Sequence, residues 1–100
     1  MKLIDVANDY LKWMIESYET NNNRNFHWNQ IRAKFPDLSE DMICDAFRML
    51  SKDGLVENKW ADNHVFLSVL DVTAIANAER NTLLVKTYRV LKEIREWIKL

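Results

Sequence analysis

Residues 39–70, SEDMICDAFRMLSKDGLVENKWADNHVFLSVL, carry the strongest structural signal in the chain. Ser39 is a preferred N-cap residue, and Gly54 suits the left-handed position just past a helix end. Between them, apolar residues recur at helical spacing: Ile43, Ala46, Phe47 and Leu50. Two strand-like runs follow, Leu55–Trp60 and His64–Leu70, separated by the turn Ala61-Asp62-Asn63. The stretch therefore predicts a capped helix that leads into a β-hairpin. In the second run, Val65, Leu67 and Val69 alternate with Phe66 and Ser68, which predicts a half-buried strand.

The residues before this stretch predict two more helices. A helical apolar pattern runs from Leu3 to about Glu19, and its apolar arc of roughly 200° is wider than an ordinary surface helix needs. This width predicts two packing partners for the first helix. Residues 20–25 have the composition of a loop. A second helix is expected from about His27 to Lys34, ended by Pro36.

The residues after the hairpin predict a short helix from Asp71 to about Asn81 and a last helix from about Thr82 to Ile98. With 100 residues the chain is long enough for one domain. We therefore expect a single α+β domain over residues 1–100, a winged helix-turn-helix. Additional N- and C-terminal helices surround its small antiparallel β-hairpin, and the helix at 82–98 is a candidate oligomerisation helix.

Composition narrows the functional classes. The apolar fraction is 48% and the formal net charge is −1, so a globular protein without a strong basic field is expected. A single cysteine, Cys44, rules out an internal disulfide and fits the reducing cytoplasm. No signal peptide or membrane span is recognisable. The expected localisation is cytoplasmic, with no membrane partner.

The end of the chain resembles a known family. Asn81-Thr82-Leu83, Lys86-Thr87-Tyr88, Leu91-Lys92-Glu93-Ile94 and Glu96-Trp97-Ile98-Lys99 are similar to segments of the YjcQ-like winged-helix proteins, which are small proteins of Gram-positive bacteria and their phages. The resemblance covers about residues 39–99. Ala74 and Asp71 depart from it, standing where the family has a glycine and a threonine. It implies a winged-helix fold and DNA binding, without a mechanism.

The fold makes DNA the first partner to consider, and the function expected first is a DNA-binding transcriptional regulator of bacterial or phage type. The outer face of the helix after Ser39 carries Asp41, Asp45, Arg48 and Lys52, and its cations could contact bases or phosphates. The candidate DNA-binding residues are Arg48, Lys52, Lys59, Arg32, Lys34, Asn63 and His64. The alternative is a solvated face on which Asp45 pairs with Arg48. Trp60 either contacts the minor groove of DNA or a protein partner, or it folds over the hairpin and covers the edges of the core.

The rival function is a winged-helix protein–protein interaction module without DNA affinity. Charge clustering discriminates between the two. DNA binding is favoured if the cations Arg24, Arg32, Lys34, Arg48, Lys52 and Lys59 gather on one face, and the rival is favoured if acids intersperse. No catalytic motif, cofactor motif or metal-ligand spacing is present, so we expect no enzyme, no cofactor and no metal. Cys44 is expected to be a half-buried residue that packs at the edge of the core.

Aromatic residues indicate a further partner. Tryptophan is enriched at protein interfaces, and the first and last helices both supply more apolar surface than one small core needs. We therefore expect a homodimer through these helices, with Trp13, Leu84, Tyr88, Leu91 and Trp97 at its interface.

Overall fold

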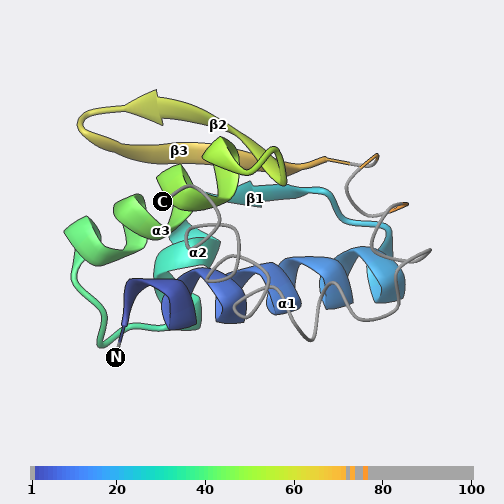
Figure 1. The fold of residues 1–100 in the computed structure, drawn as a ribbon, viewed down its shortest axis with the longest axis horizontal. Helices are drawn as coiled ribbons and strands as arrows, with labels where there is room; N and C mark the ends of the chain where they lie inside the picture. Colours follow the sequence, from blue (N-terminus) through green and yellow to red (C-terminus); the bar gives the residue numbers. More distant parts are fainter. Residues whose placement is uncertain (1, 72, 74–75, 77–100) are drawn as a thin grey trace, which may run out of the picture.

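The computed structural model of this chain describes residues 2–71, 73 and 76. They form a small α+β domain of three helices and a three-stranded antiparallel sheet, an arrangement compatible with a winged helix (Figure 1). The elements in chain order are α1 (Leu3–Asn21), β1 (Asn25–His27), α2 (Trp28–Lys34), α3 (Glu40–Lys52), β2 (Val56–Ala61) and β3 (His64–Leu70). Two helices were expected after residue 70. Only three residues of that part of the chain are described, Asp71, Thr73 and Ala76, so both predictions lie outside the described residues.

The sheet has one strand more than the sequence predicted. Its order is β1-β3-β2, so β3 lies in the centre, and the sheet lies along one side of the helices (Figure 1). The residues assigned to a loop at 20–25 instead end α1 at Asn21 and begin β1 at Asn25. β1 pairs Asn25 with Val69 and His27 with Leu67. Residues 22–24 do form a loop, as predicted, but its two ends were wrong, and β1 was missed because a three-residue strand shows no periodicity of its own.

Both ends of α3 agree with the prediction. At the start, the Ser39 hydroxyl accepts a hydrogen bond of 3.2 Å from the backbone N–H of Met42. At the end, Gly54 has φ +76°, and its N–H donates to the carbonyl of Ser51 at 2.9 Å. The Leu55 N–H donates to the carbonyl of Leu50 at 3.0 Å. This pair of bonds is a Schellman motif, which satisfies the last carbonyls of α3 and turns the chain into β2.

The hairpin differs from the prediction in its turn and in the phase of β3. Ala61 pairs with His64, so the turn contains only Asp62 and Asn63, at φ 52° and 68°, as in a type I′ turn. The register shifts between Lys59 and Trp60, which leaves Phe66 as an extra residue of β3. The buried residues of β3 are consequently Val65, Ser68 and Leu70, and the regular alternation predicted for Val65, Leu67 and Val69 fails.

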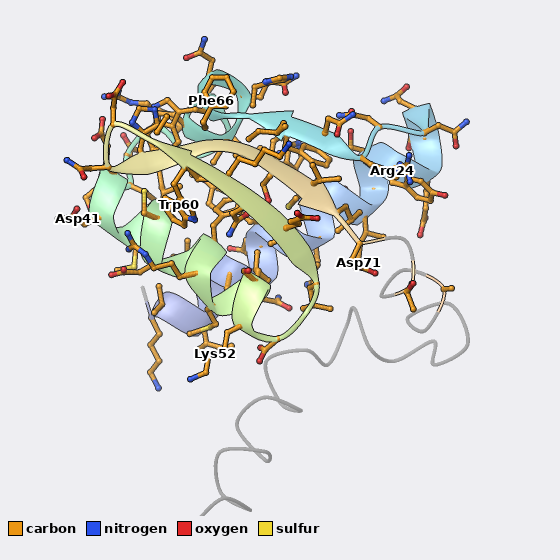
Figure 2. The ribbon with its side chains drawn as sticks, turned by 90° about the horizontal axis from the view of Figure 1, so that it is seen from above. Arg24, Asp41, Lys52, Trp60, Phe66 and Asp71 are labelled. Carbon is orange, nitrogen blue, oxygen red and sulfur yellow. The ribbon has the colours of Figure 1, made fainter. Side chains whose placement is uncertain are left out.

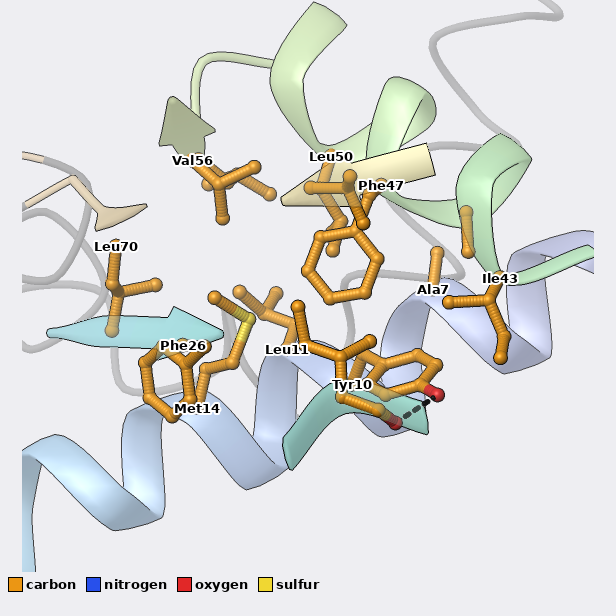
Figure 3. Packing of buried hydrophobic residues seen from close by; sticks show 14 of the residues in the cluster. Ala7, Tyr10, Leu11, Met14, Phe26, Ile43, Phe47, Leu50, Val56 and Leu70 are labelled. Atoms are coloured by element: carbon orange, nitrogen blue, oxygen red, sulfur yellow. Dashed lines mark hydrogen bonds between the residues drawn. The ribbon is translucent and has the colours of Figure 1, made fainter. Parts of the chain in front are cut away.

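The core lies between α1, α2, α3 and the inner face of the sheet (Figure 3). Tyr10 is at its centre, with ring centroids 4.9 Å from Phe35 and 5.0 Å from Phe47. Its hydroxyl donates a hydrogen bond of 2.8 Å to the carbonyl of Ile31, drawn in Figure 3. That carbonyl belongs to the last turn of α2. Burial raises the pKa of the Tyr10 phenol.

Much of the wide apolar arc of α1 is used within this one core. Its buried residues are Val6, Ala7, Tyr10, Leu11, Met14 and Ile15. Four others are partly buried and pack at the margin of the cluster: Leu3, Ile4, Trp13 and Tyr18. In the described part of the chain, no helix is long and apolar enough to cross a membrane.

Candidate functional site

The outer face of α3 presents the four charged residues that the sequence placed there. Asp41, Asp45, Arg48 and Lys52 are all exposed. Asp41 lies in the first turn of α3, where it complements the positive end of the helix dipole, and Asp45 lies in the next turn. Both carboxylates face an anion that approaches this end of α3. Asp41 therefore stabilises the helix, and both carboxylates repel phosphate groups.

Arg48 is held by two neighbours. Its Nη1 lies 2.7 Å from Asp45 Oδ1, which confirms the i,i+3 pair considered from the sequence. Its guanidinium also lies over the indole of Trp60, 4.6 Å from the ring centroid. An exposed ion pair and an exposed cation–π contact are each worth up to about 1 kcal/mol. Arg48 would have to break both contacts before its guanidinium could form bidentate hydrogen bonds to a guanine base.

The position of Trp60 follows from a polar link between β2 and α3. Asn58 donates from Nδ2 to the carbonyl of Phe47 at 2.8 Å, and its Oδ1 accepts from the hydroxyl of buried Ser68 at 2.7 Å. Asn58 therefore faces α3. Because side chains alternate along a strand, Trp60 faces the same side, beyond the edge of the core. It is 42% exposed and lies beside α3 (Figure 2). Trp60 thus borders α3 as an exposed aromatic residue and is not folded into the core.

Lys59 points away from this surface. It lies between Asn58 and Trp60 in β2, so alternation places its side chain on the opposite face of the sheet. There it stands across from Leu67 in the register. The same outer face holds Phe66, which is 53% exposed and has its ring centroid 6.4 Å from that of His27. Figure 2 shows Phe66 on the side of the hairpin away from Trp60.

The other predicted DNA-binding residues occupy several places. Arg32 of α2 forms an ion pair of 3.0 Å with Glu40 of α3. The Lys34 ammonium lies 5.7 Å from the ring centroid of Phe35. His64 stacks against Trp28, with centroids 4.7 Å apart and planes at 31°. Only three of the seven share the α3 side of the hairpin: Arg48, Lys52 and Asn63. The structure therefore divides the predicted set among separate surfaces.

Acidic residues are interspersed among the cations. Residues 2–71 contain twelve Asp and Glu against eight Lys and Arg, a formal charge of −4. Arg32 and Arg48 are both in ion pairs, and Arg24 lies at the far end of the molecule from Asp41 (Figure 2). The six cations therefore do not gather on one face, and acidic residues lie among them.

An open groove lies on this surface, between α3 and the hairpin turn. It has a volume of about 450 Å³ and is lined by Arg48, Trp60, Ala61, Asp62 and Asn63. A second hollow of about 280 Å³ lies between α1 and the turn that joins α2 to α3, and its lining is largely apolar: Val6, Asp9, Lys34, Phe35, Pro36, Asp37 and Leu38. The first groove contains the Arg48–Trp60 contact and is the better candidate site.

Other candidate chemistry receives less support. Cys44 is 3% exposed, so it is more deeply buried than the sequence suggested and is shielded from reagents. No group of three or more metal-ligating side chains comes together among residues 2–71, 73 and 76.

Trp13, the described member of the predicted dimer interface, packs edge-on against Phe26, with ring centroids 5.0 Å apart. Leu84, Tyr88, Leu91 and Trp97 lie outside the described residues.

Comparisons of the chain with protein-family models, with curated proteins and with solved structures find no match.

Proposed function

We propose that the chain is a winged helix-turn-helix domain that serves as a protein–protein interaction module, with the surface formed by α3 and the hairpin as its binding face. The observation that carries the proposal is the contact between Arg48 and the exposed ring of Trp60 beside a groove. Tryptophan and arginine are the residues most enriched at the energetic centres of protein interfaces. The buried thiol of Cys44 suits a reducing, cytoplasmic setting for this module.

Electrostatics supports the choice of a protein partner over DNA. A DNA-binding face gains most of its non-specific affinity from cations that neutralise phosphates. Here two carboxylates, Asp41 and Asp45, lie on the helix that would enter the major groove, and Arg48 is engaged by Asp45. Lys59, on the outer face of the sheet, does not reinforce that helix.

The second candidate function is the DNA-binding regulator. One observation favours it: Arg48 and Asn63 line the same groove, and Lys52 lies one helical turn beyond Arg48. These three residues could together contact one stretch of DNA backbone if the Asp45–Arg48 pair opened. A homodimer would then present two such faces, as a palindromic site requires.

Titration of a fluorescently labelled duplex of random sequence at low salt separates the two functions. Fluorescence anisotropy is expected to show no binding that depends on Arg48 or Lys52. The variant with both Asp41→Asn and Asp45→Asn is a positive control. Removing two carboxylates reduces repulsion of the DNA phosphates, so its affinity for the duplex should rise enough to be measured. Duplex binding by the unaltered chain that is lost on Arg48→Ala would overturn the proposal in favour of the regulator.

A further inference from the structure

The groove between α3 and the hairpin is shallow and wide open to solvent, and regular elements border it. One wall is α3, and the other is the type I′ turn at Asp62 and Asn63. The walls are tied together by the hydrogen bond from Asn58 to the carbonyl of Phe47, at 2.8 Å. Since each wall is regular secondary structure or a tight turn, the groove needs little reorganisation to receive a ligand, which lowers the entropic cost of binding.

On and beside the groove, carboxylates outnumber cations by three to two. Asp62 lines it, and Asp41 and Asp45, which are not among its lining residues, lie exposed on α3. Against these three carboxylates stand Arg48 and Lys52, and the described domain as a whole is acidic. An acidic partner would be repelled here, whereas a cationic partner would be attracted to the groove from a distance.

Arg48 shows how this surface holds a guanidinium. Its side chain combines the face of the Trp60 ring, at 4.6 Å, with a carboxylate oxygen of Asp45, at 2.7 Å. Trp60 keeps 42% of its surface exposed with Arg48 in place. The groove therefore offers an arriving arginine or lysine the same two kinds of contact, an aromatic face and a carboxylate.

We propose that the groove binds a segment of a partner protein that carries arginine or lysine, with a cationic side chain against the Trp60 indole and Asp41, Asp45 and Asp62 as its counter-charges. The inference rests on the proposed interaction function and specifies the chemistry of the partner. Shape, aromatic exposure and charge all point to this class of ligand.

The probe is a short peptide of arginine, serine and alanine, titrated calorimetrically into the full chain at low salt. A matched peptide with glutamate in place of arginine is the comparison. We expect the arginine peptide to bind and the glutamate peptide not to bind. Trp60→Leu should weaken binding about threefold or more through loss of the cation–π contact. Asp41→Asn with Asp45→Asn should weaken it further and flatten its dependence on salt.

Two matched controls lie on the opposite face of the sheet. Phe66→Leu removes an aromatic ring that is more exposed than Trp60, and Glu57→Gln removes an exposed carboxylate, so both should leave peptide affinity unchanged. Equal losses in Trp60→Leu and Phe66→Leu, or no loss in either, would mean general attraction to an acidic domain and would overturn the inference. Because Trp60→Leu could perturb the hairpin, the indole N–H resonance of Trp60 in the unaltered chain is followed as well, and it must shift on adding the arginine peptide.

The two proposals fail in different ways. If the glutamate peptide binds at Trp60 and the arginine peptide does not, the cationic partner is wrong while a protein-binding groove remains. If duplex DNA binds through Arg48, the interaction function itself is wrong.

Discussion

Asn58 on β2 and Phe47 on α3 are joined by a hydrogen bond from the Asn58 side-chain amide to the Phe47 carbonyl, at 2.8 Å. The Asn58 oxygen also accepts from the hydroxyl of Ser68, which is fully buried. This small network fixes the distance between hairpin and helix, and with it the place of Trp60 over Arg48. It is polar, partly buried and fully paired among the described residues, which is the condition under which such a network specifies one geometry.

We therefore predict that Asn58→Ala lowers the free energy of unfolding by about 1–3 kcal/mol, because the Ser68 hydroxyl is left buried without its acceptor. Urea denaturation measures the change. Asn29→Ala, at an exposed position of α2, is the matched control and should have little effect. Equal stability of Asn58→Ala and the original chain would contradict a structural role for the network.

A second prediction concerns Gly54. Its φ of +76° lies in the left-handed region, and a Cβ added there would meet no atom within 4 Å. The cost of substitution is thus conformational and not steric crowding by neighbours. Gly54→Val should destabilise the protein by more than about 1 kcal/mol, and Gly54→Asn should cost less because asparagine tolerates this conformation. Thermal denaturation measures both variants. Equal melting temperatures for Gly54→Val and Gly54→Asn would contradict the left-handed conformation at this helix end.

A third prediction concerns Tyr10, whose hydroxyl binds the carbonyl of Ile31. Tyr10→Phe should cost about 0.5–1.5 kcal/mol, because the buried hydrogen bond to that carbonyl is lost. The pKa of the phenol is raised by burial, so the unfolded chain ionises first as pH rises. Stability contributed by the neutral phenol is complete below the unfolded pKa of about 10 and declines above it. Denaturation measured across this range should show a steeper alkaline loss for the original chain than for Tyr10→Phe. Parallel pH profiles of the two proteins would contradict a buried neutral phenol.

A fourth prediction is the homodimer. Trp13 packs against Phe26 within the domain. Trp13→Glu would therefore destabilise the folded monomer, and it is a poor test of dimer formation. Leu84→Glu and Leu91→Glu are better tests, since the sequence predicts that both lie on the apolar side of the last helix. Light scattering should give the mass of a dimer for the original chain and a lower mass for these variants. A monomer mass that is independent of concentration would contradict the dimer.

Local signals in the sequence predicted much of the fold. Ser39 and Gly54 mark the ends of α3 because capping depends on a few neighbouring residues, and both predictions are confirmed. The two strands of the hairpin were placed to within a residue at each end. β1 was missed because three residues become a strand only by pairing with β3, far away in the chain. The extra residue Phe66 was missed for the same reason, since a bulge is a property of two paired strands.

The candidate site was less predictable. The sequence correctly placed Arg48 and Lys52 on the exposed face of α3, and it raised the pair between Asp45 and Arg48. It could not show that Trp60 would lie against Arg48, because this contact depends on how the hairpin crosses the helix. Nor could it show that Lys59 faces away from α3, which requires the phase of β2 relative to α3. Long-range packing decided which of the predicted residues share a surface.

Binding at the α3–hairpin surface is observed by following the backbone and indole N–H resonances of one isotopically labelled sample, first with random duplex DNA and then with the arginine peptide. Our account predicts that the peptide shifts the Trp60 indole and the amides of Asp45 and Asp62. The duplex should leave these signals and that of Arg48 in place at low salt. Shifts of Arg48, Lys52 and Asn63 on adding duplex, with none at Trp60 on adding peptide, would contradict it.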